Sequence, residues 1–236
     1  VADVLGNPAM WELTPELALV DINAEKLEDM RRLAERIKEF RESRSVITAT
    51  TNREEALAGA DYVLISVTRN RYELWEQDFR VPLSYGFLHA YGENGGPGAL
   101  FHSLRSIHLI LPICRDIERL CPDAMVFNYS NPESRVLLAM LTLTKLRAVG
   151  LCHGQQGTRN LICQYLDKTD DEIETVGAGI NHFFWLYSVR DKQTGEDLYP
   201  KLRRKLDEGG TIPPLADILY RSFGLLPFPS DDHIGE

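Results

Sequence analysis

The sequence predicts an α/β protein: a doubly wound, Rossmann-like parallel sheet followed by part of an α+β domain. Short apolar segments alternate with helical patterns at least five times within the first 151 residues. One of them, residues 62–67, is a nearly continuous apolar run with Ser66 as its one small polar residue, as in strands that are covered on both faces. Beyond residue 166 the alternation stops and two β-like runs follow each other directly, which indicates a second kind of sheet.

Composition narrows the class of protein. The chain has 236 residues, 44% of them hydrophobic, which is enough to bury a sizeable core. A formal net charge of −9, with no long run of lysine and arginine, argues against a nucleic-acid partner. The four cysteines lack the density of a disulfide scaffold, and no apolar stretch approaches the roughly 20 residues that span a bilayer. We expect a cytoplasmic protein without a membrane partner.

The first elements read as strand and helix in turn. An apolar run ends at Asp21, and Asn23 can cap the helix that follows. A β-branched run at 46–49 precedes a brief helix, for which Thr51 and Glu54 offer a capping box. The pattern is that of a strand, a helix, a second strand and a second helix.

Later segments continue the alternation and then change it. The sheet domain is completed by helices at 71–85 and 100–120, a strand at 124–127, a helix at 132–143 and a strand at 147–151. The second region contains a helix at 155–166, β runs at 172–178 and 182–189 that we expect to pair antiparallel, a helix at 198–206, a helix ending at Phe223 and a proline-rich loop.

Asp21 ends what would be the second strand of a dinucleotide-binding fold. An acidic residue there accepts hydrogen bonds from the adenosine ribose and favours NAD over NADP, although a plain polar loop residue is the alternative. The glycine-rich phosphate loop that should precede it is absent from residues 1–20. Either the fold never bound a dinucleotide, or the loop lies upstream of Val1. We favour the second, because residues 2–11 resemble the end of the helix that would follow such a loop.

Two loops offer groups to a ligand. Residues 92–98 contain four glycines, which allow close approach of a ligand or form a mobile linker. Asn128 and Asn131 follow the strand at 124–127, where their amides would lie beyond the carboxyl edge of the sheet and hold a sugar or a nicotinamide. An asparagine–proline turn that caps the next helix is the alternative for this segment.

Cysteine and histidine follow two of the predicted strands. Cys152 and His153 stand where the apolar run 148–151 should end, and His182 follows a second β-like run. A thiolate with an imidazole favours a transition-metal ion, and two protein ligands leave coordination positions free for substrate oxygens. A cysteine after a strand more often serves as a small, buried, apolar residue. The neighbouring candidate ligand-binding segments, with Asp21, residues 92–98 and Asn131, favour the metal site.

Taken in order, these segments resemble glycoside hydrolase family 4, the NAD- and manganese-dependent glycosidases related to lactate and malate dehydrogenases. The resemblance covers nearly the whole chain. It rests on residues 16–22 (ELALVDI), 60–63 (ADYV), 92–98 (GENGGPG) with Arg105, 121–124 (CPDA), 128–132 (NYSNP), 150–154 (GLCHG), 179–182 (GINH) and 233–236 (HIGE).

The resemblance implies α-glycoside hydrolysis by a redox route. NAD⁺ takes hydride from sugar C3, the ketone acidifies the C2 proton, and β-elimination expels the C1 substituent before water adds and hydride returns. Mn²⁺ or another divalent ion binds the sugar hydroxyls as a Lewis acid. α-Galactosides are the leading substrate class, with α-glucosides, α-glucuronides and α-galacturonides close behind, and the family suggests a homodimer or homotetramer.

The resemblance also assigns residue roles. Cys152 and His182 match the family's metal ligands, and Asn131 matches its substrate-contacting asparagine, with Asn128 beside it. His153 stands where members acting on non-phosphorylated α-glycosides carry histidine, so it would bind substrate and protonate the leaving oxygen, or serve as a structural loop residue.

The remaining roles concern the base and the cofactor. Asp231 and Asp232 are the candidates for the base that removes the C2 proton, with solvated loop carboxylates as the alternative. Cofactor contacts are expected at Asp21, Asn23, Val67, Thr68 and Glu93.

The chain also departs from the family. It lacks the first strand and the phosphate loop and stops at Glu236, so we expect an NAD-binding domain at 1–151 without its first strand and glycine loop, and a partial substrate- and metal-binding domain at 152–236. Two other functions stay open. A 2-hydroxy-acid dehydrogenase of the lactate/malate type leaves Cys152 unexplained, and an inactive sugar- or nucleotide-binding fragment fits the missing loop.

Overall fold

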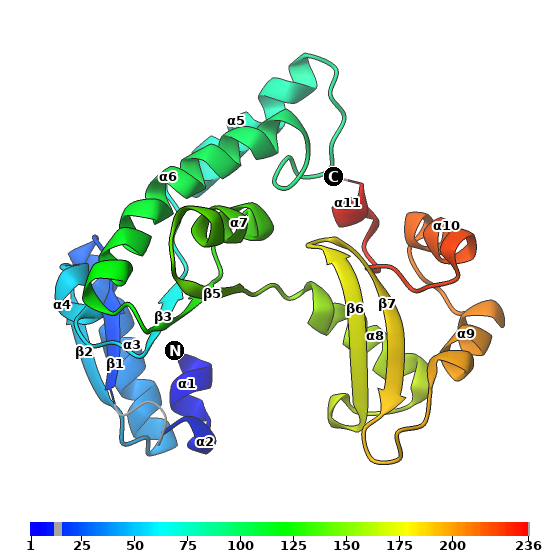
Figure 1. Ribbon diagram of the computed structural model, residues 1–236, viewed down its shortest axis with the longest axis horizontal. Helices are drawn as coiled ribbons and strands as arrows, with labels where there is room; N and C mark the ends of the chain where they lie inside the picture. The colour runs from blue at the N-terminus through cyan, green and yellow to red at the C-terminus, as the bar shows by residue number, and fades with distance from the viewer. Residues whose placement is uncertain (12–15, 236) are drawn as a thin grey trace. The chain divides into compact units, whose positions relative to one another are not determined.

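The computed structural model of the protein describes residues 1–11 and 16–235 (Figure 1). The chain forms two compact units. The first contains Val1–Val63, Pro112–Met125 and Thr144–Arg147, and the second contains Leu64–Leu111, Val126–Leu143 and Ala148–Glu236. The domain boundary that the sequence places after residue 151 stays a prediction.

The first unit is built on a parallel strand pair. β1 (Glu16–Val20) and β2 (Val46–Thr50) run in register from Glu16 opposite Val46 to Val20 opposite Thr50. α3 (Ala24–Arg41) connects them, and the Asn23 side chain caps it by accepting a hydrogen bond of 3.0 Å from the Lys26 amide. The predicted strand, capped helix and strand are confirmed.

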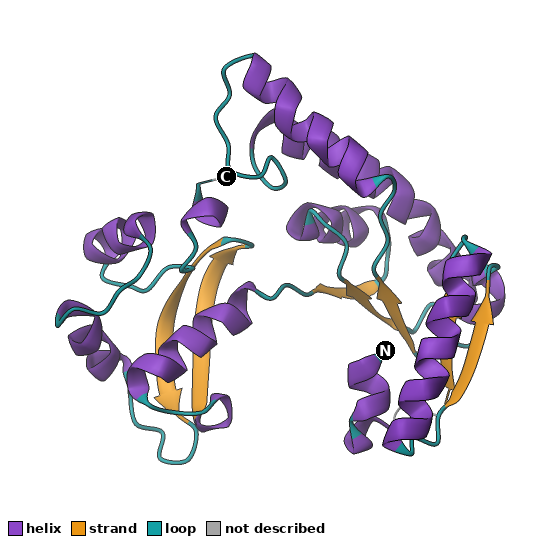
Figure 2. Ribbon diagram, turned by 180° about the vertical axis from the view of Figure 1, so that it is seen from behind, coloured by secondary structure: helices purple, strands orange, loops and turns teal. Residues whose placement is uncertain are grey.

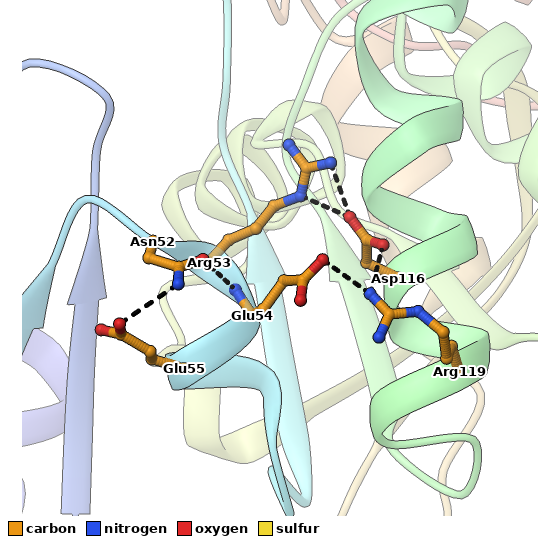
Figure 3. Close-up of polar contacts among 6 residues, drawn as sticks. All are labelled: Asn52, Arg53, Glu54, Glu55, Asp116 and Arg119. Atoms are coloured by element: carbon orange, nitrogen blue, oxygen red, sulfur yellow. Dashed lines mark hydrogen bonds and ion pairs between the residues drawn. The ribbon is translucent and has the colours of Figure 1, made fainter.

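The short helix α4 (Arg53–Leu57) begins differently from the prediction. Its cap is Asn52, whose side chain accepts from the Glu54 amide at 3.1 Å, so the capping box predicted for Thr51 is wrong. Charged side chains of α4 meet the end of α6 (Gly96–Leu120), where Asp116 lies 2.6 Å from Arg53 and 2.9 Å from Arg119 (Figure 3).

Two short helices open the chain. α1 (Ala2–Gly6) and α2 (Pro8–Trp11) are separated at Asn7, whose backbone is extended. The sequence predicts the end of a single helix here. The interruption fits the proline at position 8, because the residue before a proline is disfavoured in the helical conformation.

A second sheet contains β3 (Tyr62–Ile65), β4 (Met125–Asn128) and β5 (Arg147–Gly150), in the order β3-β4-β5. β3 and β4 are parallel, since the Met125 amide donates to the Asp61 carbonyl and, four residues along both strands, the Tyr129 amide donates to the Ile65 carbonyl. The orders β2-β1 and β3-β4-β5 match strands 3-2 and 4-5-6 of a dinucleotide-binding sheet, which confirms the predicted fold class.

One detail of β3 is wrong in the prediction. The nearly continuous apolar run suggests a strand covered on both faces, yet Tyr62 and Leu64 are 62% and 60% exposed. Tyr62 and Leu64 lie on one face of the strand, and this face is exposed. Ile65 lies on the opposite face and is buried.

The glycine-rich segment is partly helical. The sequence predicts a loop over residues 92–98 and a helix from residue 100, whereas α6 already begins at Gly96, with Pro97 in its first turn. A Cβ at Gly98 would lie 2.2 Å from the carbonyl oxygen of Asp78 in α5 (Arg71–Ser84). This glycine therefore permits close packing of α6 on α5. α7 (Glu133–Leu143) follows β4 as predicted.

The predicted antiparallel pair is a hairpin. β6 (Ile173–Ile180) and β7 (Phe183–Asp191) pair antiparallel, after the short 3₁₀ helix Asp170–Glu172. α8 (Gly154–Leu166) lies along one face of this hairpin (Figure 2), and α9 (Tyr199–Asp207) and α10 (Pro214–Phe223) complete the same core. Fully buried members of this core include Ile162, Leu186, Leu202 and Leu226.

Two further observations complete the fold. The end of the predicted proline-rich loop is a helical turn, α11 (Asp231–Ile234), that begins after Ser230. Among the helices of residues 1–11 and 16–235, none has the length and apolar character needed to span a membrane.

Candidate active site

Cys152 lies in the link between β5 and α8. Its side chain is exposed, and its Sγ lies 3.7 Å from Nε2 of His182. The hydrogen bond from His182 lowers the pKa of the Cys152 thiol to about 7, with smaller contributions from Asn181 and the Gly154 backbone, against an opposing effect of burial. The adjacent α8 N-terminus also favours negative charge. A large fraction of Cys152 is therefore a thiolate near neutral pH.

His182 occupies the turn between β6 and β7. The turn consists of Asn181 and His182, and the His182 φ of 66° is uncommon for a residue other than glycine. The imidazole stacks on the Phe228 ring at 5.7 Å and meets the His233 ring edge-on at 4.3 Å between centroids. The left-handed backbone and the two rings together direct Nε2 toward Cys152.

The Cys152 and His182 pair fits a metal ion. Bonds of roughly 2.3 Å to sulfur and 2.1 Å to nitrogen at a tetrahedral angle place two ligand atoms about 3.6 Å apart. The observed 3.7 Å between Sγ and Nε2 agrees with this separation. The described residues contain no group of three or more histidine, cysteine, aspartate or glutamate side chains that could hold a metal, and the Cys152 and His182 pair offers two ligand atoms.

The loop before α6 brings two residues to this site that the sequence analysis does not single out. Asn94 Nδ2 lies 3.2 Å from Nδ1 of His182, and the Tyr91 hydroxyl donates to Oδ2 of Asp232 at 3.2 Å. Tyr91 also packs against His233 at 5.1 Å. An amide next to a glutamate in a glycine-rich loop is the one local signal that points to Asn94.

The two adjacent aspartates have different surroundings. Both carboxylate oxygens of Asp231 accept backbone amides at the start of α10, from Leu215 at 2.9 Å and Ala216 at 3.0 Å. Asp232 is exposed and meets the Tyr91 hydroxyl. Asp231 thus caps a helix, while Asp232 is exposed beside Tyr91, whose ring packs against His233.

The asparagine segment after β4 contains one buried and one ligand-accessible side chain. Asn128 is fully buried, donates to the Ser130 carbonyl at 3.0 Å and accepts from the Ser130 amide at 3.1 Å. Asn131 is exposed, and its amide donates to Oε1 of Glu93 at 2.9 Å. Since Glu93 adjoins Asn94, the loop before α6 connects Asn131 with the Cys152 and His182 pair.

The other predicted contacts are more dispersed. The amide and carbonyl of Val67 bond the Ser130 hydroxyl at 2.9 and 3.1 Å, and Thr68 lines a small cavity of about 30 Å³ together with Glu93. Asp21 and Asn23 belong to the other unit. There, Oδ1 of Asp21 accepts from the Asn23 amide at 2.8 Å, while the Asn23 side chain is occupied as the cap of α3.

His153 adjoins Cys152 in the chain, and Glu133 lies beside Gly150, two residues before it. His153 is exposed at the N-terminus of α8, and its imidazole forms no hydrogen bond with any of the described residues. Glu133, which the sequence analysis does not single out, is 7% exposed, and its carboxylate occupies the space beside Gly150 where a Cβ would lie. Burial raises the pKa of the Glu133 carboxyl, and the charge of His182 partly opposes this.

Comparisons with known proteins point to one family. The family model "Family 4 glycosyl hydrolase" matches residues 4–168, and that of the C-terminal domain of the same family matches residues 177–235. An alpha-glucosidase of Erwinia rhapontici is 39% identical over 222 residues, which are 93% of this chain and 49% of the relative. An alpha-galactosidase of Bacillus subtilis (strain 168) is 34% identical over 209 residues, which are 87% of this chain and 48% of the relative.

A solved structure shares the fold. It is a 6-phospho-alpha-glucosidase from gut microorganisms in complex with NAD and Mn²⁺, with a TM-score of 0.80 and 22% identity over 92% of this chain and 55% of that one. The chain thus spans about half the length of the proteins that it matches.

Proposed function

Since this chain belongs to family 4 of the glycosyl hydrolases, we propose that it carries the active site of an NAD- and divalent-metal-dependent α-glycosidase. The observation that carries the proposal is the 3.7 Å approach of Cys152 Sγ to His182 Nε2, with a thiol pKa near 7. A 2-hydroxy-acid dehydrogenase would give this pair no role.

The proposed site residues fall into two sets, one that would bind the metal ion and one that would bind NAD. Cys152 and His182 would hold Mn²⁺ or another divalent ion, whereas Asp21, Asn23, Val67, Thr68 and Glu93 are the proposed contacts of NAD. When bound, the ion supplies Lewis acidity and NAD⁺ accepts and returns hydride. The similar structure that contains both NAD and Mn²⁺ supports this cofactor set.

We assign proton transfer at C2 to Asp232. Its carboxylate is exposed beside Tyr91, whereas both oxygens of Asp231 are engaged by α10. A base must reach the proton that it removes, and a carboxylate already bonded to two backbone amides is poorly placed to do so. Asp231 then positions Asp232 by fixing the turn that carries both.

Substrate contacts are proposed for Asn131 and His153. Asn131 presents its amide oxygen at the same loop that carries Glu93, and Asn128 supports it by holding the turn at Ser130. His153 follows Cys152 in the chain, and its exposed imidazole has no hydrogen-bond partner among residues 1–11 and 16–235, which suits proton donation to the leaving oxygen.

Two sugars are the first substrates to compare. The sequence favours α-galactosides, and the relatives that match most of the chain include both an alpha-glucosidase and an alpha-galactosidase. We therefore propose non-phosphorylated α-glucosides and α-galactosides as the substrate class. The two sugars differ only at C4.

The test is cleavage of aryl α-glucoside and aryl α-galactoside by the purified protein with NAD⁺, Mn²⁺ and a thiol reductant, run in D₂O. The expected result is cleavage that requires both additions and places deuterium at C2 of the released sugar. Cleavage that persists after removal of NAD⁺ and metal would contradict the mechanism. Binding of NAD⁺ and Mn²⁺ without cleavage would instead support a sugar- or nucleotide-binding fragment.

The setting of the protein is part of the proposal. We propose a cytoplasmic homodimer or homotetramer. The four cysteines are free thiols, and Cys114 and Cys121 are buried, which fits a reducing compartment. Light scattering coupled to size exclusion tests the assembly, and a monomer at micromolar concentration would rule it out.

A further inference from the structure

Asn94 is buried against the metal-ligand candidate His182. The side chain is 8% exposed, and its amide nitrogen lies 3.2 Å from Nδ1 of the imidazole. Its carbonyl oxygen Oδ1 is buried and has no hydrogen-bond partner among the described residues. A buried amide oxygen without a partner is uncommon and calls for an explanation.

The amide can face the imidazole in two senses that differ only by exchange of oxygen and nitrogen. With Nδ2 toward Nδ1, the ring proton must be on Nε2, where it points at the Cys152 sulfur. With Oδ1 toward Nδ1, the ring proton is on Nδ1 and the Nε2 lone pair faces Cys152. Only the second sense leaves Nε2 able to ligate a metal, and it also pairs the orphaned oxygen.

We propose that Asn94 is a positioning residue that holds the proton of His182 on Nδ1 whenever a divalent cation is bound between His182 and Cys152. Histidines that ligate metals almost always donate their other ring N–H to a carbonyl, carboxylate or water, which fixes the tautomer. Asn94 supplies that carbonyl here. This inference rests on the proposed function, because it assumes that Cys152 and His182 hold the cation.

Other groups already fix the position of the His182 ring, so Asn94 acts on the position of the ring proton. The His182 ring is already confined by its φ of 66° and by Phe228 and His233. The loop that carries Asn94 is fixed independently, since a Cβ at Gly98 would lie 2.2 Å from the Asp78 carbonyl oxygen. Replacing Asn94 should therefore leave the fold and the ring position intact and change the proton position on the imidazole.

Two substitutions separate the carbonyl from the side chain as a whole. Asn94→Leu removes the acceptor at similar size, while Asn94→Asp keeps an acceptor oxygen in either sense. Asn160→Ala is the matched control, because Asn160 is an exposed asparagine of the same unit. Mn²⁺ affinity is measured by the EPR signal of free Mn²⁺, without NAD⁺ or sugar. The His182 tautomer is read from two-bond ¹H–¹⁵N couplings in the diamagnetic Zn²⁺ complex.

The expected result is a loss of about 10- to 100-fold in Mn²⁺ affinity for Asn94→Leu. Asn94→Asp should stay within about threefold of the parent protein or bind more tightly, and the control should not change. The parent Zn²⁺ complex should carry its proton on Nδ1. Unchanged affinity in Asn94→Leu, or a proton on Nε2 in the parent complex, would overturn the inference.

Cys152→Ser distinguishes this inference from the proposed function. If the parent protein binds Mn²⁺ no more tightly than Cys152→Ser, the metal site itself is refuted and the role of Asn94 with it. If Cys152 is needed and Asn94→Leu binds like the parent protein, only the role of Asn94 fails.

Discussion

Two polar clusters of the molecule use similar groups in different ways. Between α4 and α6, four charged side chains form a chain of ion pairs: Arg53 with Asp116, Asp116 with Arg119, and Arg119 with Glu54. Each charge has an opposite charge within 2.9 Å (Figure 3). Around Cys152, the partners are an imidazole, an amide and aromatic rings, and the buried amide oxygen of Asn94 has no partner among the described residues.

The difference separates structural from functional polarity. The α4–α6 network pairs its own charges, and Arg119 and Arg53 lower the pKa of the Asp116 carboxyl. The Cys152 cluster retains an exposed thiolate and an exposed carboxylate at Asp232. Unused bonding capacity, rather than the number of polar groups, marks the candidate active site.

The largest effect is expected from replacing the exposed carboxylate of Asp232. Asp232→Asn should lower the rate of C2 proton exchange by about 10²- to 10⁴-fold, because the amide cannot accept the proton. Deuterium incorporation at C2, followed by NMR of the sugar, measures the rate. Thermal unfolding should not change.

The neighbouring Asp231 is the control for that experiment. Asp231→Ala should destabilise the protein by about 0.5–2 kcal/mol through loss of the bonds to α10. If Asp231→Ala keeps full stability while Asp231→Asn abolishes exchange, the roles of the two aspartates are reversed.

Removing the thiolate should have the next largest effect. Cys152→Ser should weaken Mn²⁺ binding by about 100-fold or more, since an outer partner alone is worth about 10- to 100-fold. Equilibrium dialysis of the metal measures the change. Cys163→Ser, at a half-buried cysteine of α8, should bind like the parent protein, and equal losses in both variants would refute the assignment.

A smaller effect concerns pH. The Cys152 pKa is lowered to about 7, so its thiolate forms as pH rises through 7 and is lost as pH falls below it. At pH 7 about half of Cys152 should react as thiolate, against about 3% for an ordinary cysteine of pKa near 8.5. Iodoacetamide labelling of the metal-free protein, read by mass spectrometry, gives the profile.

The comparison thiol behaves in the opposite way. Burial raises the pKa of Cys163, so its labelling should begin only at a higher pH. Equal labelling of Cys152 and Cys163 at pH 7 would show that His182 does not stabilise the Cys152 thiolate.

The smallest effect is expected in the paired network. Arg119→Ala should lower Tm by at most about 4 °C, because exposed ion pairs contribute little and salt screens them. Calorimetry in low and in high salt measures the shift, which should shrink in high salt. A larger, salt-independent loss would mean that this network does more than pair its own charges.

The sequence predicts what depends on neighbours along the chain. Asn23 caps α3 through the amide three residues later, and the alternation of strands and helices along the chain follows from local periodicity. The same local reasoning misplaces the cap of α4 at Thr51, because the adjacent Asn52 offers a competing side chain. Errors of this kind shift an element by a residue and leave the fold unchanged.

The site depends on partners that are distant in sequence. Asn94 meets a histidine 88 residues away, and Asp232 meets a tyrosine 141 residues away. Asp231 and Asp232 are identical in type and adjacent, so only their partners in space distinguish a helix cap from an available carboxylate. Cys152 and His182 are indicated by their positions after predicted strands together with the family resemblance. For Asn94 the one local signal is its place next to a glutamate in a glycine-rich loop, and Tyr91 has none.

The attachment of Asp231 to α10 affects when conformational freedom is lost. Two backbone amides hold this carboxylate, so the turn that carries Asp232 becomes ordered as the protein folds. The entropy cost of ordering the Asp232 side chain is then met during folding, before any sugar binds. A substrate meeting a preorganised carboxylate keeps more of its binding free energy for the reaction itself.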